Sequence, residues 1–116
     1  MKKILGVCLI LLCSVVSAEV NQNKPEKFKL QMCEEILGGA MFNRVLEDVC
    51  GFNGGVKDKL KKTYDEGGCR SIVPQERVNA IANDVLLDSR NRYKAFGEKD
   101  FCEANLKGYA DLAGQD

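Results

Sequence analysis

Apolar residues recur at helical spacing through most of the chain. Steps of three and four residues indicate an amphipathic helix over 25–50 and a second, shorter helix over 56–66. The same spacing predicts a third helix from Pro74 to Phe96 and a fourth that begins at Asp100. No convincing alternation of apolar and polar residues, as in a half-buried strand, occurs along the chain. We therefore expect an all-α fold, a small bundle of about four helices.

Glycines and caps refine this pattern. Gly38-Gly39 stands inside the first helix, as a kink or as a point of close helix contact. Gly97 is expected to end the third helix, and Asp100 to cap the fourth while Glu103 reaches back, a variant of the capping box. The apolar face predicted for the third helix consists of Val78, Ile81, Val85, Leu86, Tyr93 and Phe96.

Residues 1–18 have the pattern of a cleaved secretory signal peptide. Lys2 and Lys3 precede an apolar run over 4–16, and Val16-Ser17-Ala18 places small residues at the cleavage position. The run is shorter than the roughly 20 residues that cross a membrane. Lipid attachment at Cys8 or Cys13 is the alternative. Such attachment normally needs a small residue just before the cysteine, but a bulky residue precedes each of these two. We expect cleavage after Ala18 and delivery to the bacterial periplasm or the medium.

The mature chain is expected to have a disordered segment over 19–24 and one helical domain over 25–116. Cleavage removes two lysines and leaves 15 basic against 17 acidic residues, a net charge of −2. A chain so close to neutral offers no electrostatic case for a nucleic-acid partner. A domain of this size buries limited surface and gains from covalent cross-links.

Four cysteines remain after cleavage, and their even number in an exported chain predicts two disulfides. Cys33 and Cys50 lie 17 positions apart on one predicted helix, or about 25 Å at 1.5 Å per residue. A disulfide needs Cα atoms about 4.4–6.8 Å apart, so this pair is excluded unless the glycines fold the helix back. In an up-and-down bundle, Cys33 and Cys69 lie at one end, and Cys50 and Cys102 lie at the other. We therefore predict Cys33–Cys69 and Cys50–Cys102, one bond at each end.

The chain contains no histidine, which removes the commonest general base and the commonest nitrogen ligand for metals. The cysteines lack the spacing of a zinc site, and no calcium-loop motif occurs. The adjacent carboxylates Glu34-Glu35 and Asp65-Glu66 are the remaining candidates for acid–base chemistry. Neighbours in a helix point in different directions, however, so a solvated surface explains them better. We predict no catalytic residue, no metal and no cofactor, and keep a small carboxylate-dependent enzyme as a second alternative.

Four lysines make the second helix basic: Lys57, Lys59, Lys61 and Lys62. Asp58, Asp65 and Glu66 lie among them, so a solvated face with local ion pairs is one interpretation. The functional interpretation is a docking surface for an acidic partner, and these lysines are the candidate partner-binding residues.

The segment Asp48-Val49-Cys50-Gly51-Phe52, together with Phe101-Cys102, resembles the small periplasmic secretin pilotins of type II secretion. The resemblance implies a helical protein in which a cysteine near the end of one helix is tied to another near the last helix. This sequence departs from the pilotins in having two further cysteines and no obvious lipid site.

A small exported helical domain without catalytic groups most often works by binding. The function we expect is therefore that of a non-catalytic protein-binding protein, in its sharper form an inhibitor or immunity-type protein. A pilotin-like assembly factor for a secretion system is the first alternative.

Overall fold

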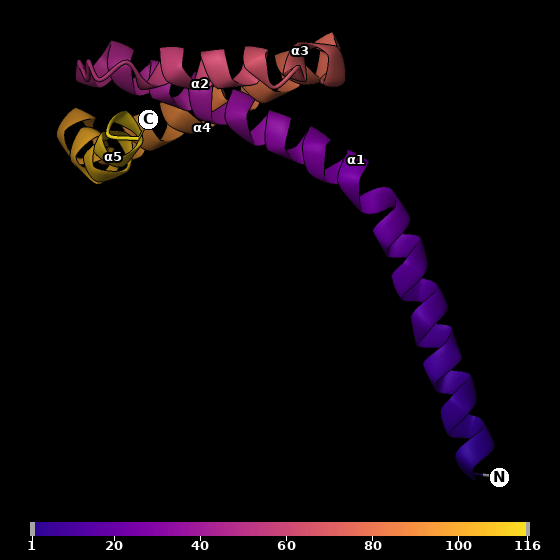
Figure 1. Cartoon of the computed structure of the whole chain (residues 1–116). Helices are drawn as coiled ribbons and strands as arrows, with labels where there is room; N and C mark the ends of the chain where they lie inside the picture. The colour runs from indigo at the N-terminus through magenta and orange to yellow at the C-terminus, as the bar shows by residue number, and fades with distance from the viewer. Residues whose placement is uncertain (1, 116) are drawn as a thin grey trace. The chain divides into compact units, whose positions relative to one another are not determined.

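The computed structural model describes the backbone of residues 2–115 and the side chains of residues 26–115. In this part of the chain every regular element is a helix, as predicted. The helices are α1 (Lys2–Cys50), α2 (Val56–Glu66), α3 (Cys69–Ile72), α4 (Gln75–Phe96) and α5 (Glu98–Ala113) (Figure 1). The one-turn helix α3 was not predicted, because a segment this short carries no periodicity.

The chain divides into two compact units, Met1–Gln31 and Met32–Asp116. The predicted leader over 1–18 and the segment 19–24 belong to the first unit. The backbone over 19–24 is part of α1, whereas the sequence predicts a disordered segment there. Cleavage after Ala18 remains a prediction. Within the described residues, no helix combines the length and the apolar character needed to cross a membrane.

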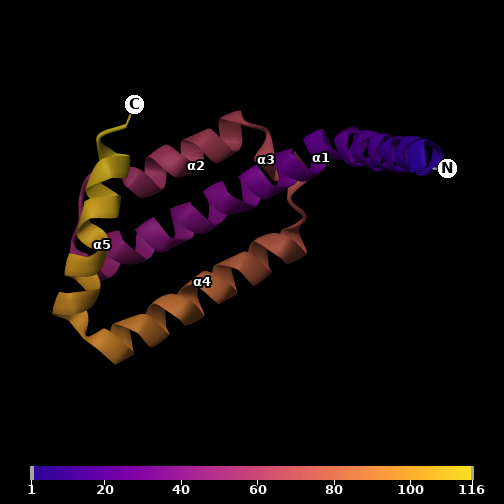
Figure 2. The same ribbon diagram turned by 90° about the horizontal axis from the view of Figure 1, so that it is seen from below.

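In the second unit, α2 and α4 lie on either side of α1, and α5 runs across the ends of all three (Figure 2). The glycine pair of α1 marks where the neighbours approach: a Cβ on Gly38 would lie 3.8 Å from Ile81 of α4, and one on Gly39 would lie 3.5 Å from Leu60 of α2. The helix continues through both glycines. They are therefore points of close contact, and they do not fold α1 back on itself.

Two disulfides tie the unit together, and they join the pairs that the up-and-down argument predicts. Cys33 bonds to Cys69, with 5.4 Å between their Cα atoms, and Cys50 bonds to Cys102, with 5.6 Å. Each bond belongs to a different apolar cluster. The first cluster surrounds Cys33–Cys69 and consists of Leu37, Tyr64, Val73 and Ile81. The second lies beside Cys50–Cys102 and consists of Leu46, Val56, Phe101 and Tyr109.

The predicted cap of the last helix is wrong. The helix begins at Glu98, with Gly97 as its N-cap residue and no side-chain cap. Gly97 has a φ of +85°, a conformation that a residue with a Cβ rarely adopts. This residue turns the chain directly from α4 into α5, so Asp100 falls inside the first turn and cannot act as the cap.

The predicted apolar face of the third helix is only partly buried. Ile81 is 8% exposed, but Leu86 is 51% and Phe96 is 63% exposed. In their place the polar Ser89 is buried, at 2%. The reason is the arrangement of helices: α4 packs on α1 and α5. Because no other helix of the described part of the chain lies beside it, part of its apolar stripe remains in solvent.

Candidate functional site

The four lysines of α2 do not form one surface. Lys57 and Lys61, one helical turn apart, border a cleft between α1 and α2. Lys59 and Lys62 line a different hollow, beside the end of α5. The Nζ of Lys59 donates to the carbonyl oxygens of Ala113, at 2.9 Å, and Gln115. Because these carbonyls end α5, Lys59 satisfies the C-terminus of that helix.

The cleft beside Lys57 and Lys61 has a volume of about 270 Å³. We call it the basic cleft. Its apolar lining comes from Leu37, Ala40, Met41 and Tyr64, and its charged lining from Arg44, Lys57, Lys61, Asp65 and Arg70. The four cations belong to three helices, α1, α2 and α3, so the fold assembles this rim from separate parts of the sequence.

The cations of the rim differ in how firmly they are paired. The Nε of Arg70 lies 2.7 Å from the carboxylate of Asp65, a close pair. Lys57 lies 3.4 Å from Asp58, and Arg44 lies 3.9 Å from Asp48; both pairs are at the surface, where such contacts are weak. Lys61 has no ion pair or hydrogen bond to any other described residue. The rim therefore keeps positive charge available to a ligand.

Tyr64, in the lining of the basic cleft, is 7% exposed, and its hydroxyl oxygen is buried without a hydrogen-bond partner among the described residues. Burial raises the pKa of Tyr64, the charge of Arg70 lowers it and the charge of Asp65 raises it. The hydroxyl thus stays protonated at neutral pH, and it lies close to the paired charges of Arg70 and Asp65.

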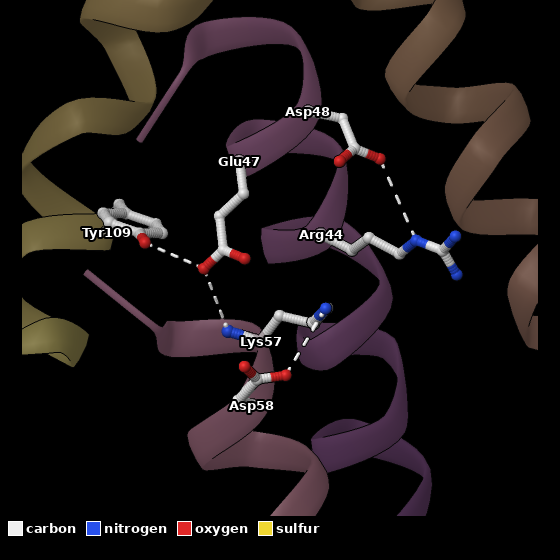
Figure 3. Close-up of polar contacts among 6 residues, drawn as sticks. All are labelled: Arg44, Glu47, Asp48, Lys57, Asp58 and Tyr109. Atoms are coloured by element: carbon white, nitrogen blue, oxygen red, sulfur yellow. Dashed lines mark hydrogen bonds and ion pairs between the residues drawn. The ribbon is translucent and has the colours of Figure 1, made fainter. Parts of the chain in front are cut away.

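A second polar cluster lies where α1, the start of α2 and α5 meet, and Figure 3 shows Glu47 at its centre. The carboxylate of Glu47 accepts a hydrogen bond from the Tyr109 hydroxyl at 2.8 Å and another from the backbone N–H of Lys57 at 3.2 Å. The Tyr109 hydroxyl in turn accepts from the N–H of Gly54 at 2.7 Å. Glu47 thereby satisfies an N–H in the first turn of α2. The cluster has a complete structural explanation.

The predicted carboxylate pairs do not come together as a site. Glu34 accepts a hydrogen bond at 2.7 Å from Arg77 of α4, and Asp65 pairs with Arg70. Glu66 lies 3.8 Å from Lys62. Among the residues whose side chains are described, no group of three acidic or cysteine side chains is placed to hold a metal ion.

Sequence reasoning missed Arg44, Arg70 and Glu47. A signal for Arg44 existed, because Leu37, Ala40, Met41 and Arg44 follow helical spacing and so share a face of α1. Arg70 and Glu47 carry no such signal, since their roles depend on contacts between helices.

Comparison of the chain with protein-family models, with curated proteins and with solved structures finds no match. The basic cleft therefore has to be interpreted from its own geometry.

Proposed function

We propose that this chain is an exported, non-catalytic protein that binds another protein through an acidic part of the partner's surface. An inhibitor or immunity-type protein is the specific form of this proposal. The observation that carries it is the basic cleft, where Arg44, Lys57 and Lys61 and the paired charges of Arg70 and Asp65 border an apolar floor. Charge complementarity around a desolvated centre is how protein interfaces gain both association rate and specificity.

The disulfide beside the basic cleft supports the proposal. Cys33, one turn before Leu37, is bonded to Cys69, and Cys69 directly precedes Arg70. The disulfide therefore connects the apolar floor to one cation of the rim. A binding surface that is already ordered loses little conformational entropy on association.

Export is consistent with the two disulfides, because such bonds persist in oxidising compartments and are rare in the cytosol. The short Lys-Lys leader points to the bacterial periplasm or the medium. Both destinations rest on the signal-peptide prediction.

The experiment compares two charge-reversed variants of equal net charge. The cleft variant carries Lys57→Glu and Lys61→Glu, and the control carries Lys99→Glu and Lys107→Glu, two exposed lysines of α5. Immobilised wild type and both variants are incubated with periplasmic extract, and bound proteins are quantified by mass spectrometry. We expect at least one protein that the wild type and the control retain and that the cleft variant loses. Equal retention by all three forms would contradict a role for the cleft.

A pilotin-like assembly factor is the second candidate, favoured by the bond between Cys50 at the end of α1 and Cys102 in the last helix. A pilotin binds a helix in an apolar groove. Here Val45, Val49, Leu86 and Tyr93 contribute to a hollow of about 310 Å³ between α1 and α4. A captured protein that Leu86→Glu loses and the cleft variant retains would favour this candidate over the first.

A further inference from the structure

The volume of the basic cleft lies just below the usual range of small-molecule pockets and is large enough for one side chain. Its volume is about 270 Å³. Ligand pockets usually span about 300–1,000 Å³. A dry cavity of about 150 Å³ already accepts benzene. The space between α1 and α2 therefore matches a phenyl ring or a leucine side chain, with some room to spare.

The floor of the cleft is suited to such a side chain. Leu37, Ala40 and Met41 present one face of α1, and the Tyr64 ring closes the opposite side from α2. Ala40 is the smallest of these side chains, and a methionine beside it adapts to differently shaped partners. An apolar group entering here would leave water and contact apolar atoms from two helices.

The positive rim of the cleft favours negatively charged residues on either side of the inserted side chain. Lys57 and Lys61 stand on the α2 edge, and Arg44 on the α1 edge. Lys61 has no partner among the described residues, and the ion pairs of Lys57 and Arg44 are long and exposed. Carboxylates that flank an inserted apolar side chain would meet these cations.

We propose that the basic cleft receives a single phenylalanine- or leucine-sized side chain of the partner protein, carried on an acidic segment whose carboxylates pair with Lys57, Lys61 and Arg44. This inference rests on the proposed function and specifies its recognition rule. The apolar side chain is the anchor of the complex. The flanking acids provide specificity, because only an apolar side chain on an acidic segment also pairs with the cations of the rim.

The test uses two synthetic peptides, acetylated and amidated at their ends. One reads Asp-Glu-Glu-Phe-Glu-Glu-Asp, and the other has serine in place of phenylalanine. Binding to the wild type is measured by isothermal titration calorimetry at low salt. We expect the phenylalanine peptide to bind at least tenfold more tightly, a ratio equivalent to about 1.4 kcal/mol. A ratio near one, or no measurable binding of either peptide, would overturn the inference.

Two variants separate the anchor from the charge. Ala40→Leu fills the cleft without changing its charge, so it should abolish the preference for phenylalanine and leave the weak serine peptide unaffected. The cleft variant with Lys57→Glu and Lys61→Glu should weaken both peptides, whereas the Lys99→Glu, Lys107→Glu control should behave as the wild type. Thermal melting checks that each variant is folded, and the wild-type ratio remains decisive if one is not.

The inference and the proposed function can fail separately. If the extract experiment still shows a protein lost by the cleft variant while the peptide ratio is one, the partner binds by charge alone and only the anchor is refuted. If the capture experiment also shows no dependence on the cleft, the proposed function fails as well.

Discussion

The hydroxyl of Tyr109 offers a direct test of how the helices are held in place. Replacing Tyr109 with phenylalanine keeps the ring, which packs against Phe52 with centroids 4.9 Å apart, and removes two hydrogen bonds. One is accepted from the N–H of Gly54 at 2.7 Å, and the other is donated to the carboxylate of Glu47 at 2.8 Å. These bonds connect α5 to the loop before α2 and to α1, so the substitution loosens three elements at once.

The expected cost follows from the type of each bond. A neutral hydrogen bond contributes about 0.5–1.5 kcal/mol to stability, and one to a charged group about 1.5–3 kcal/mol. Tyr109 is 5% exposed, but Glu47 is only half-buried and keeps its bond to the N–H of Lys57. Water can therefore recover part of the loss. We expect Tyr109→Phe to lower the free energy of unfolding by about 2 kcal/mol.

Tyr93→Phe is the matched control. Its hydroxyl also donates to a glutamate, Glu98, but at 3.2 Å and in an exposed position. We expect a loss below about 0.5 kcal/mol, the usual range for surface substitutions. Both variants are unfolded in urea with the disulfides intact, and their midpoints are compared at a common slope. Equal destabilisation by the two substitutions would refute the argument that burial of the Glu47–Tyr109 bond makes it valuable.

Three further predictions concern pH, the buried hydroxyl of Tyr64 and redox behaviour. Burial, followed by the hydrogen bond to Glu47, raises the pKa of Tyr109 above its usual value of about 10. The folded state therefore holds the proton of the Tyr109 hydroxyl more tightly than the unfolded state does. The stability present below about pH 10 should fall as the pH rises further, and it should fall less in Tyr109→Phe. Urea unfolding between pH 8 and 11 measures this difference. Tyr64→Phe should leave stability unchanged or raise it, as thermal melting would show, because the removed hydroxyl has no described partner; a loss above about 1 kcal/mol would reveal a hidden hydrogen bond. Under limited dithiothreitol the half-buried Cys50–Cys102 bond should be reduced before Cys33–Cys69, whose cysteines are each 2% exposed. Mass mapping after alkylation gives the order. The reverse order would contradict access of the reductant to the sulfur atoms as the controlling factor.

Local pattern was sufficient for most of the fold. The bounds predicted for α2 are those observed, and the pairing of Cys33 with Cys69 followed from helix length and chain direction alone. These successes share a cause: each depends on spacing within one helix or on which ends of neighbouring helices meet. The exposure of Leu86 could not be predicted in this way, because it depends on whether another helix covers that side of α4.

The candidate site was harder to predict for a related reason. Lysines on α2 are visible in the sequence, but their separation into two groups depends on what lies beside each face of the helix. Lys59 is used by the end of α5, at a sequence distance of 54 residues from Ala113, and no local pattern signals that contact. Charge counting on α2 therefore overstates the surface available to a partner.

The disulfide at Cys33–Cys69 and the basic cleft are better understood together than apart. The helix α3 has four residues, too few to be stable by its own hydrogen bonds. It is held by the bond at Cys69, by the burial of Val73 and by the ion pair of Arg70 with Asp65. Arg70 can line the cleft only while α3 is held against α1 and α2. The same bond that compensates for a small core therefore also keeps one charged wall of the proposed binding site in position, so loss of this disulfide would affect binding as well as stability.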